Sequence, residues 1–214
     1  MQVLDIRGRD AHEEWRIPGS HHLSWDDGTP ADCSRLDREE PVVVVCGSGN
    51  ASLDAARQMR ERCGVDARSL AGGMARWSFA WNAAELTDEQ TDLSVVQLRR
   101  TGKGCLSYLI GSDDEAVAVD PALDPSIFRR EAERRGWTIT GVLETHLHAD
   151  HASRGRALAR SVGADHYLPE GAATEFDHGT LADGEAVTVG AARVRVLETP
   201  GHTSAGLTYR AGDF

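Results

Sequence analysis

Positive charge, membrane-length apolar runs and paired cysteines are all scarce in this sequence. Lys and Arg number 23 against 34 Asp and Glu, which gives a formal net charge of −11 over 214 residues. This balance argues against a nucleic-acid partner, because the phosphate backbone favours clusters of Lys and Arg. No apolar run approaches the length of a membrane span, and the N-terminus has no long apolar segment typical of a signal peptide. We therefore expect neither nucleic acid nor membrane as a partner.

The four cysteines are spread widely and show no paired spacing: Cys33, Cys46, Cys63 and Cys105. Such spacing is not that of a disulfide framework, and we expect free thiols in a reducing cytoplasm. The hydrophobic content of 40% is compatible with a proper core. The length suits one large domain or two ordinary ones.

Ligand-type side chains are densest in one heptapeptide that follows the apolar run 141–143: Thr145-His146-Leu147-His148-Ala149-Asp150-His151. In an extended segment alternate side chains share a side, so His146 and His148 should point the same way. Asp150 stands where a helix should begin, since 152–162 has helical periodicity. Imidazole and carboxylate suit zinc, iron or manganese, whereas calcium prefers oxygen ligands alone. The pattern predicts a metal site; the alternative is a solvated, histidine-rich turn.

This heptapeptide resembles the H-x-H-x-D-H signature of the metallo-β-lactamase fold at every position. A second segment, Glu198-Thr199-Pro200-Gly201-His202-Thr203, is similar to the P-G-H-T turn that delivers the next histidine in that family. Asp120-Pro121 resembles the family's I-D-P turn. The alternation of strand-like and helix-like segments fits half of the family's αββα sandwich.

A second reactive feature follows the β-branched run 42–45, which is typical of a strand buried on both faces. The loop that ends this run is Cys46-Gly47-Ser48-Gly49-Asn50-Ala51-Ser52, and a helical pattern over 53–62, closed by Gly64, comes next. The two glycines let backbone N–H groups turn inward, and the helix directs its positive end to the same place. Such surroundings lower a cysteine pKa and make Cys46 a candidate nucleophile. The alternative is a buried, inert cysteine.

The first 80 residues resemble a rhodanese domain. The resemblance rests on four segments in order, namely Asp5-Ile6-Arg7, Ile17-Pro18-Gly19, the Cys46 loop and Ala71-Gly72-Gly73-Met74-Ala75-Arg76-Trp77. It implies a parallel-sheet domain in which Cys46 carries a persulfide. The loop residues that would cradle the sulfur are Gly47, Ser48, Gly49, Asn50, Ala51 and Ser52. Ala51 takes the place of the family's loop arginine, which removes a cation that helps to bind an anionic sulfur donor.

We expect an α/β chain of three parts: a rhodanese-like domain at 1–80, a polar, acidic linker at 81–93 and a partial metallo-β-lactamase sandwich at 94–214. The rhodanese-like part starts abruptly and is expected to be truncated. The metallo-β-lactamase resemblance implies a further T-G-D carboxylate and a later histidine, so we also expect the C-terminal part of that domain to be absent. Asp213 is an alternative ligand, but it follows His202 closely and better fits a hairpin turn.

The resemblance leaves two metal chemistries open. With two zinc ions, His146, His148 and His202 would bind the first, and Asp150 and His151 the second, which gives a hydrolase. With one iron, His146 and His202 would bind it and the other three residues would support the site. The heptapeptide matches the T-H-x-H-A-D-H form of persulfide dioxygenases, whereas glyoxalase II proteins usually carry T-H-H-H-x-D-H. Fe(II) is therefore the expected metal, and zinc is the alternative.

We therefore expect a fused sulfurtransferase and iron-dependent persulfide dioxygenase that oxidises a glutathione persulfide-type substrate with O₂ to sulfite. The alternatives are a glyoxalase II-like thioester hydrolase and a non-catalytic sulfur relay through Cys46. The expected partner is a small thiol or persulfide, and an oligomer is compatible with the sequence. Five further histidines lack ligand partners at useful spacing and are interpreted as surface or packing residues: His12, His21, His22, His166 and His178.

Overall fold

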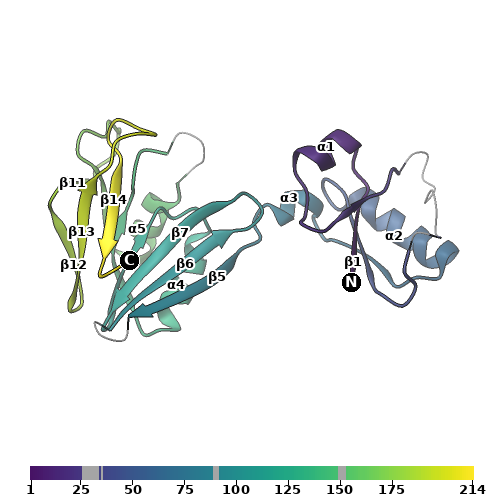
Figure 1. Ribbon diagram of the computed structural model, residues 1–214, viewed down its shortest axis with the longest axis horizontal. Helices are drawn as coiled ribbons and strands as arrows, with labels where there is room; N and C mark the ends of the chain where they lie inside the picture. Colours follow the sequence, from purple (N-terminus) through teal and green to yellow (C-terminus); the bar gives the residue numbers. More distant parts are fainter. Residues whose placement is uncertain (26–33, 35, 89–91, 149–152) are drawn as a thin grey trace. The chain divides into compact units, whose positions relative to one another are not determined.

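The computed structural model of this chain describes residues 1–25, 34, 36–88, 92–148 and 153–214. The chain divides into two compact units, Met1–Ala80 and Trp81–Phe214 (Figure 1). Within the described residues, no helix combines the length and the apolar character that a membrane crossing requires.

The first unit is built on a parallel sheet of four strands in the order β2-β1-β3-β4. The strands are β1 (Gln2–Asp5), β2 (His21–His22), β3 (Val42–Val45) and β4 (Ala67–Ser69). The helices are α1 (Arg9–Glu14), α2 (Asn50–Cys63) and α3 (Gly73–Trp77). The parallel-sheet domain expected from the sequence is confirmed.

The central strand β3 carries the core of this unit, because Val42, Val44 and Val45 are fully buried. Helix α2 packs Ala55 and Met59 into the same core and ends at Gly64, the residue predicted to close it. Gly64 has a φ of 67°, a left-handed conformation that glycine adopts without steric cost.

Cysteine chemistry differs from expectation at one position. Cys46 and Cys105 are free thiols, as predicted. Cys63, at the end of α2, is disulfide-bonded, so the expectation of four free thiols is wrong for Cys63. Spacing in the sequence did not indicate this bond, because a disulfide depends on Cα–Cα approach in the fold.

The second unit contains a seven-stranded mixed sheet in the order β11-β10-β9-β8-β7-β6-β5 and an antiparallel sheet in the order β12-β13-β14. The seven strands are β5 (Asn82–Asp88), β6 (Leu93–Arg100), β7 (Cys105–Ser112), β8 (Glu115–Val119), β9 (Thr138–Leu143), β10 (Asp165–Pro169) and β11 (Gly179–Leu181). The smaller sheet contains β12 (Ala186–Val189), β13 (Ala192–Glu198) and β14 (Leu207–Ala211). The two helices are α4 (Pro125–Glu133) and α5 (Gly155–Val162).

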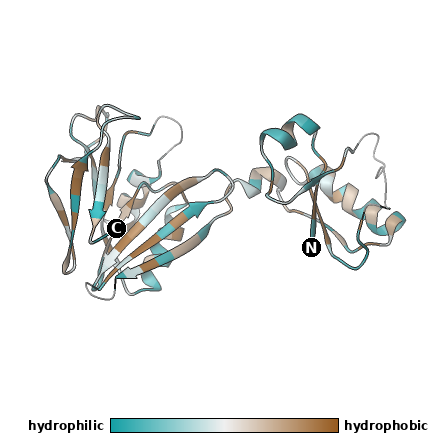
Figure 2. Cartoon of the chain, viewed as in Figure 1, coloured by the Kyte–Doolittle hydropathy of each residue, from teal (hydrophilic) through white to brown (hydrophobic). Residues whose placement is uncertain are grey.

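The large sheet separates two apolar layers, because side chains alternate between its faces. On one face, Val95 of β6 belongs to a cluster that includes Val194 of the small sheet. On the other face, its neighbour Val96 packs in a cluster with Phe128 of α4 and Leu158 of α5. Figure 2 shows the corresponding hydrophobic bands along the strands. The expected α/β class is confirmed.

The predicted linker at 81–93 is wrong for its main part, because residues 82–88 form β5. This strand pairs antiparallel with β6 along its whole length. Residues 82–87 are all exposed, so the alternation that signals a strand is missing from the sequence. The pair is reinforced by Arg135, whose Nη2 lies 2.7 Å from Glu85 Oε2. An edge strand with both faces exposed therefore resembled a linker.

Candidate functional site

The histidine-rich segment lies at the carboxyl ends of two neighbouring parallel strands. Val119 of β8 pairs with Leu143 of β9, and Asp120 and Glu144 are the next residues of each strand. The Asp120 N–H donates to the Leu143 carbonyl at 3.0 Å, which holds the two strand ends together. Ligands of open α/β sheets commonly bind at this edge.

Three of the predicted metal ligands converge here. The ring centroids of His146 and His148 lie 4.0 Å apart, and the His202 ring lies 5.2 Å from His146, edge-on to it. His202 comes from the loop between β13 and β14, more than fifty residues further along the chain. Asp150 and His151, the other two predicted ligands, lie outside the described residues, as does the predicted helix start at Asp150.

Among the described residues, the one group with suitable ligand atoms for a metal ion is Asp120, His146 and His148, whose ligand atoms all lie within 4.8 Å of one another. Both carboxylate oxygens of Asp120 already accept hydrogen bonds. Oδ1 accepts from the Thr145 N–H at 2.7 Å, and Oδ2 accepts from the Thr145 hydroxyl at 2.6 Å. The Asp120 carboxylate is therefore positioned to orient the residues that it contacts.

The hydrogen bonds of Thr145 fix the orientation of His146. The Thr145 hydroxyl gives its proton to Asp120, so its oxygen accepts from His146 Nδ1, 2.9 Å away. A neutral imidazole has one N–H, so His146 Nε2 carries the lone pair that a metal would use. This matches the common pattern in which a metal-binding histidine donates its other N–H to an oriented oxygen.

His148 is held by two carboxylates. Its Nε2 lies 3.0 Å from Asp120 Oδ1 and 3.3 Å from Glu144 Oε2. Burial alone would lower the pKa of His148, but hydrogen bonds to Asp120 and Glu144 outweigh it and raise the pKa to about 9. Because Nε2 faces the carboxylates, Nδ1 is the ring nitrogen that would be left for a metal, which would have to displace the proton that the raised pKa retains.

Glu144 is a buried carboxylate, with 3% of its surface exposed. Its Oε1 accepts from Ser153 Oγ at 2.5 Å and lies 3.2 Å from His166 Nε2. Burial alone would raise the pKa of Glu144, but the hydrogen bonds from His148, His166 and Ser153 lower it to about 2. Glu144 is therefore ionised at neutral pH and supports His148 through its contact with the ring nitrogen Nε2.

Asp120 occupies a strained backbone position. Its φ is 45°, in the left-handed region that non-glycine residues rarely adopt, although Asp and Asn tolerate it best. The three hydrogen-bonded partners of its carboxylate, described above, hold the residue in place. Backbone strain of this kind costs on the order of 1–3 kcal/mol and is concentrated at functional sites.

Imidazole nitrogens with carboxylate support fit a zinc or iron ion. The His146 ring lies close to those of His148 and His202, and one ring nitrogen of each of His146 and His148 is hydrogen-bonded to an oxygen. The set contains nitrogen donors, which calcium and magnesium avoid.

The second predicted site surrounds Cys46, which is 6% exposed at the end of β3. Its Sγ accepts from the Gly49 N–H at 3.1 Å and the Ser52 N–H at 3.3 Å, and lies 3.2 Å from Ser52 Oγ. Burial would raise the pKa of Cys46, but the hydrogen bonds from Ser52 and from the Gly49 and Ser48 amides outweigh it and lower the pKa. The loop thus stabilises a thiolate, as its glycine pattern predicts.

Close glycine packing holds the Cys46 loop. A Cβ added to Gly73 would lie 2.2 Å from the Cys46 carbonyl oxygen and 2.7 Å from the Gly49 nitrogen. One added to Gly49 would lie 2.6 Å from the Gly72 nitrogen. The Met74 N–H donates to the Cys46 carbonyl at 2.8 Å, so the β4–α3 turn supports the loop from below. Among the described residues of the predicted cradle, Gly47, Asn50 and Ala51 donate no hydrogen bond to the sulfur, in contrast to Gly49 and Ser52.

Sequence reasoning missed Asp120 and Glu144 as site residues. Asp120 was recognised only as part of a turn. Glu144 lies two and four residues before His146 and His148, so the alternation that grouped the histidines also places Glu144 on their side. That signal was present in the sequence.

Comparison with known families agrees with this geometry. The metallo-β-lactamase superfamily model matches residues 100–213, and the rhodanese-like domain model matches residues 1–80. The first match covers more than half of the chain, which therefore belongs to the metallo-β-lactamase superfamily and carries an N-terminal rhodanese-like domain.

Curated relatives share part of the second unit. Hydroxyacylglutathione hydrolase of Rhodospirillum rubrum is 36% identical over 101 residues, which is 44% of this chain and 37% of that protein. The Rhizobium etli enzyme of the same name is 39% identical over 84 residues, which is 38% of this chain and 33% of that protein. The chain thus spans little more than a third of the length of these relatives.

Solved structures also show partial similarity to this chain. ETHE1 from Myxococcus xanthus is 27% identical, with a TM-score of 0.47, covering 62% of this chain and 54% of that one. A metallo-β-lactamase from Staphylococcus aureus is 29% identical, with a TM-score of 0.48, covering 63% of this chain and 38% of that one.

Proposed function

We propose that this chain handles sulfane sulfur. Cys46 carries the sulfur as a persulfide, and the metallo-β-lactamase domain acts as an iron-dependent oxygenase on a glutathione persulfide-type substrate. The observation that supports this pairing is that one chain contains both a hydrogen-bonded cysteine thiolate and a cluster of metal-type histidines.

In the sulfur-transfer step, the Cys46 thiolate attacks the outer sulfur of a persulfide. A bond forms between Cys46 Sγ and that sulfur, and the original S–S bond breaks. The electron pair leaves with the donor thiolate, and the outer sulfur keeps its proton. The Gly49 and Ser52 N–H groups, which stabilise the thiolate, would also face the negative charge of a deprotonated persulfide.

In the second domain His146 and His202 would hold the iron, with His148 beside them and Asp150 and His151 as further proposed supports. When bound, iron supplies open coordination positions for substrate and O₂. The chain's own residues keep the imidazoles oriented: Thr145 and Asp120 act on His146, and Asp120 and Glu144 act on His148. Overall, one persulfide, one O₂ and one water give one thiol, one sulfite and two protons.

A second candidate function is thioester hydrolysis of the glyoxalase II type. It is favoured by the curated relatives, whose name specifies a hydroxyacylglutathione substrate. With zinc in place of iron, His146, His148 and His202 would hold the first ion, and Asp150 and His151 the second.

The two functions are separated by metal content, O₂ uptake and thioester hydrolysis in the same preparation. We expect about one iron per chain, and O₂ uptake with glutathione persulfide that is lost in His146→Ala. Glu170→Gln, an exposed carboxylate outside the histidine cluster, is the matched control. Two zinc ions, hydrolysis of S-lactoylglutathione and no O₂ uptake would contradict the oxygenase and support the hydrolase.

The role of Cys46 is tested by mass spectrometry after exposure to a sulfide donor. We expect a single added sulfur on Cys46 and none in Cys46→Ser. Cys105, the second free thiol among the described residues, provides an internal comparison, because it opens strand β7 and does not lie in a glycine-rich loop. Absence of the adduct on Cys46 would remove it from the function. An adduct without any O₂ uptake would indicate a sulfur relay instead.

A further inference from the structure

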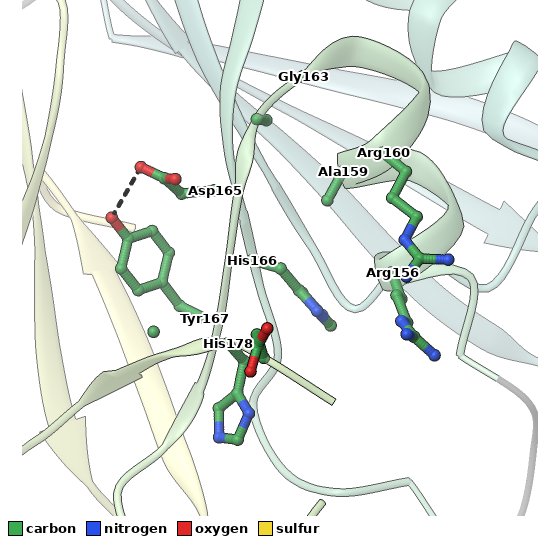
Figure 3. A pocket seen from close by; sticks show the side chains of 11 residues that line it. Arg156, Ala159, Arg160, Gly163, Asp165, His166, Tyr167 and His178 are labelled. Carbon is green, nitrogen blue, oxygen red and sulfur yellow. Dashed lines mark hydrogen bonds between the residues drawn. The ribbon is translucent and has the colours of Figure 1, made fainter. Parts of the chain in front are cut away.

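A pocket of about 720 Å³ is lined by residues of α5, β10 and the start of β11 (Figure 3), and none of the clustered histidines is among its lining residues. Its volume falls in the range of small-molecule sites, roughly 300–1,000 Å³. Its polar lining consists of Arg156, Arg160, Asp165, His166, Asp177 and His178. None of these residues was predicted to have a function, and only His166 touches the support of the histidine cluster, through its contact with Glu144.

His166 forms the floor of this pocket, and its side chain is only 9% exposed. Its Nε2 faces Glu144 Oε1, and an ionised carboxylate can only accept, so Nε2 carries the hydrogen. In the neutral ring Nδ1 is then an acceptor. Nδ1 is buried and has no hydrogen-bond partner within the described part of the chain. A buried acceptor without a donor is costly and uncommon, which indicates that a ligand donor belongs there.

Two guanidinium groups stand on the α5 side of the pocket. Arg156 and Arg160 are one helical turn apart, so they lie on one face of α5 and repel each other weakly. No carboxylate pairs with either within the described ranges, although the chain is acidic. Arg156 stacks over the Phe176 ring at 4.7 Å, and that ring stacks on His166 with centroids 5.8 Å apart. Figure 3 shows His166 pointing toward the side from which the two arginines project.

Negative groups line the pocket from the other elements. Asp165 belongs to β10, where its carboxylate accepts from the Tyr167 hydroxyl at 3.3 Å, and Asp177 precedes β11. Positive charge therefore comes from α5, and negative charge from the strand side. An anion without a positive group would be repelled by Asp177, and a cation without a negative group would be repelled by Arg156 and Arg160. A ligand that carries both signs matches the lining better than either.

We propose that this pocket binds a small zwitterion, an amino acid or short peptide, with its carboxylate on Arg156 and Arg160 and its ammonium group directed to His166 Nδ1 and Asp177. Arginine suits the first contact because its planar fork matches carboxylate geometry. The second contact supplies the hydrogen-bond donor that Nδ1 lacks.

The test uses the full chain and calorimetric titration with glycylglycine as the probe. Acetate, methylammonium and inorganic phosphate serve as single-charge comparisons. We expect the dipeptide to bind at least about tenfold more tightly than any of the three, a difference of about 1.4 kcal/mol. Equal or tighter binding of phosphate or acetate would overturn the zwitterion, and so would no detectable heat with glycylglycine at any concentration.

The residue assignment is tested with Arg156→Ala/Arg160→Ala, which replaces two exposed side chains and should leave the fold intact. Its affinity for glycylglycine should fall by at least about tenfold. The matched control is Arg193→Ala, an exposed arginine on β13 outside the pocket lining, which should bind normally. Equal binding by all three proteins would refute the role of the arginines.

The contact to His166 has a readout of its own. In a histidine-labelled sample, the Nδ1 nitrogen resonance of His166 should shift on addition of glycylglycine, because Nδ1 gains a hydrogen bond. The His178 resonance reports on the pocket rim for comparison. A titration that shows binding by calorimetry but leaves the His166 Nδ1 resonance unchanged would contradict the proposed orientation. Because Glu144 contacts both His166 and His148, the titration is run on chain freed of metal by a chelator, so that its outcome does not depend on the function proposed for the histidine cluster.

Discussion

The two candidate sites of this protein are held by different kinds of groups: the Cys46 site mainly by backbone amides, and the histidine cluster mainly by side chains. Around Cys46, most donors are backbone amides of its own loop, and all lie within six residues of the sulfur. Around His146, the polar partners are side chains from loops that are far apart in the sequence, such as Asp120 and His202. The first site is therefore specified locally, whereas the second exists only when the whole sheet has formed.

This difference determines how each site can be damaged. Only proline removes a backbone N–H, so the Cys46 site should tolerate most substitutions in its loop and fail when the loop itself is displaced. The histidine cluster depends on buried carboxylates, and buried polar networks lose much of their strength when one member is missing. Four experiments test this comparison, beginning with the largest expected effect.

Gly73→Ala should disrupt the Cys46 site, which is held mainly by backbone amides. The new Cβ would lie 2.2 Å from the Cys46 carbonyl oxygen, at a position with a φ of 56°, so the β4–α3 turn must move away from the loop. We expect a loss of about 3 kcal/mol in unfolding free energy, at the upper end of ordinary single substitutions. Denaturant unfolding followed by circular dichroism measures it.

The control for that experiment is Gly64→Ala, which also has a positive φ but no atom within 4 Å of the added Cβ. It should cost only backbone strain, about 1 kcal/mol. Equal losses in the two variants would show that the close approach at Gly73 is not what holds the Cys46 loop.

Asp120→Asn should lower the metal affinity of the histidine cluster without unfolding the chain. Asn tolerates the left-handed backbone, but its neutral amide cannot accept from both Thr145 and His148 as a carboxylate does. Loss of such a supporting residue typically lowers metal affinity by about 10- to 100-fold. Competition with a metal-binding dye measures this change.

Asp124→Asn is the matched control, since Asp124 caps α4 and contacts Ser126 rather than the histidines. It should leave metal affinity unchanged. A wild-type affinity in Asp120→Asn would mean that the carboxylate does not orient the metal ligands.

Ser52→Ala measures how much the Ser52 hydroxyl adds to the stabilisation of the Cys46 thiolate by backbone amides. It removes the hydroxyl near Cys46 Sγ but keeps the Ser52 N–H, so the Cys46 pKa should rise towards its ordinary value. A hydrogen bond to a charged group contributes about 1.5–3 kcal/mol, so the alkylation rate at pH 7 should fall by roughly tenfold. Ser69→Ala removes a contact to Ser52 but none to the sulfur, and should change the rate less. A larger effect from Ser69→Ala would argue against direct stabilisation by Ser52.

The pH dependence of Cys46 alkylation should show the smallest difference. Because folding lowers the pKa of Cys46, the thiolate forms at a lower pH in the native chain than in the urea-unfolded chain. The alkylation rate should therefore rise and reach its plateau at a lower pH in the native protein. Labelling with iodoacetamide and mass spectrometry at a series of pH values gives both curves. Coincident curves would show that the loop does not stabilise the thiolate.

The same contrast explains how far the sequence alone could lead. The Cys46 loop was predictable because its glycines, its helix start and its donors are contiguous. The convergence of His146 and His148 followed from strand alternation, and the same alternation would have included Glu144. By contrast, His166 was interpreted as a surface or packing residue, because its contact with Glu144 depends on the pairing of β10 with β9.

Two further errors have a common physical origin. The edge strand β5 was interpreted as a linker, because both of its faces are exposed and its pairing with β6 leaves no periodic signal. The disulfide at Cys63 was also missed, since it depends on an approach that the spacing does not reveal. Both features depend on neighbours in space, whereas composition and periodicity report on neighbours in the chain.

The left-handed backbone at Asp120 has a consequence for how this scaffold could acquire a different metal preference. A glutamate there would keep the negative charge but carry a longer side chain in a conformation that it adopts poorly. Asparagine and glycine fit the backbone but give up the charge. Changes in ligand chemistry are therefore easier through the loops that carry the histidines than through this carboxylate, which is fixed by chain geometry as well as by its hydrogen bonds.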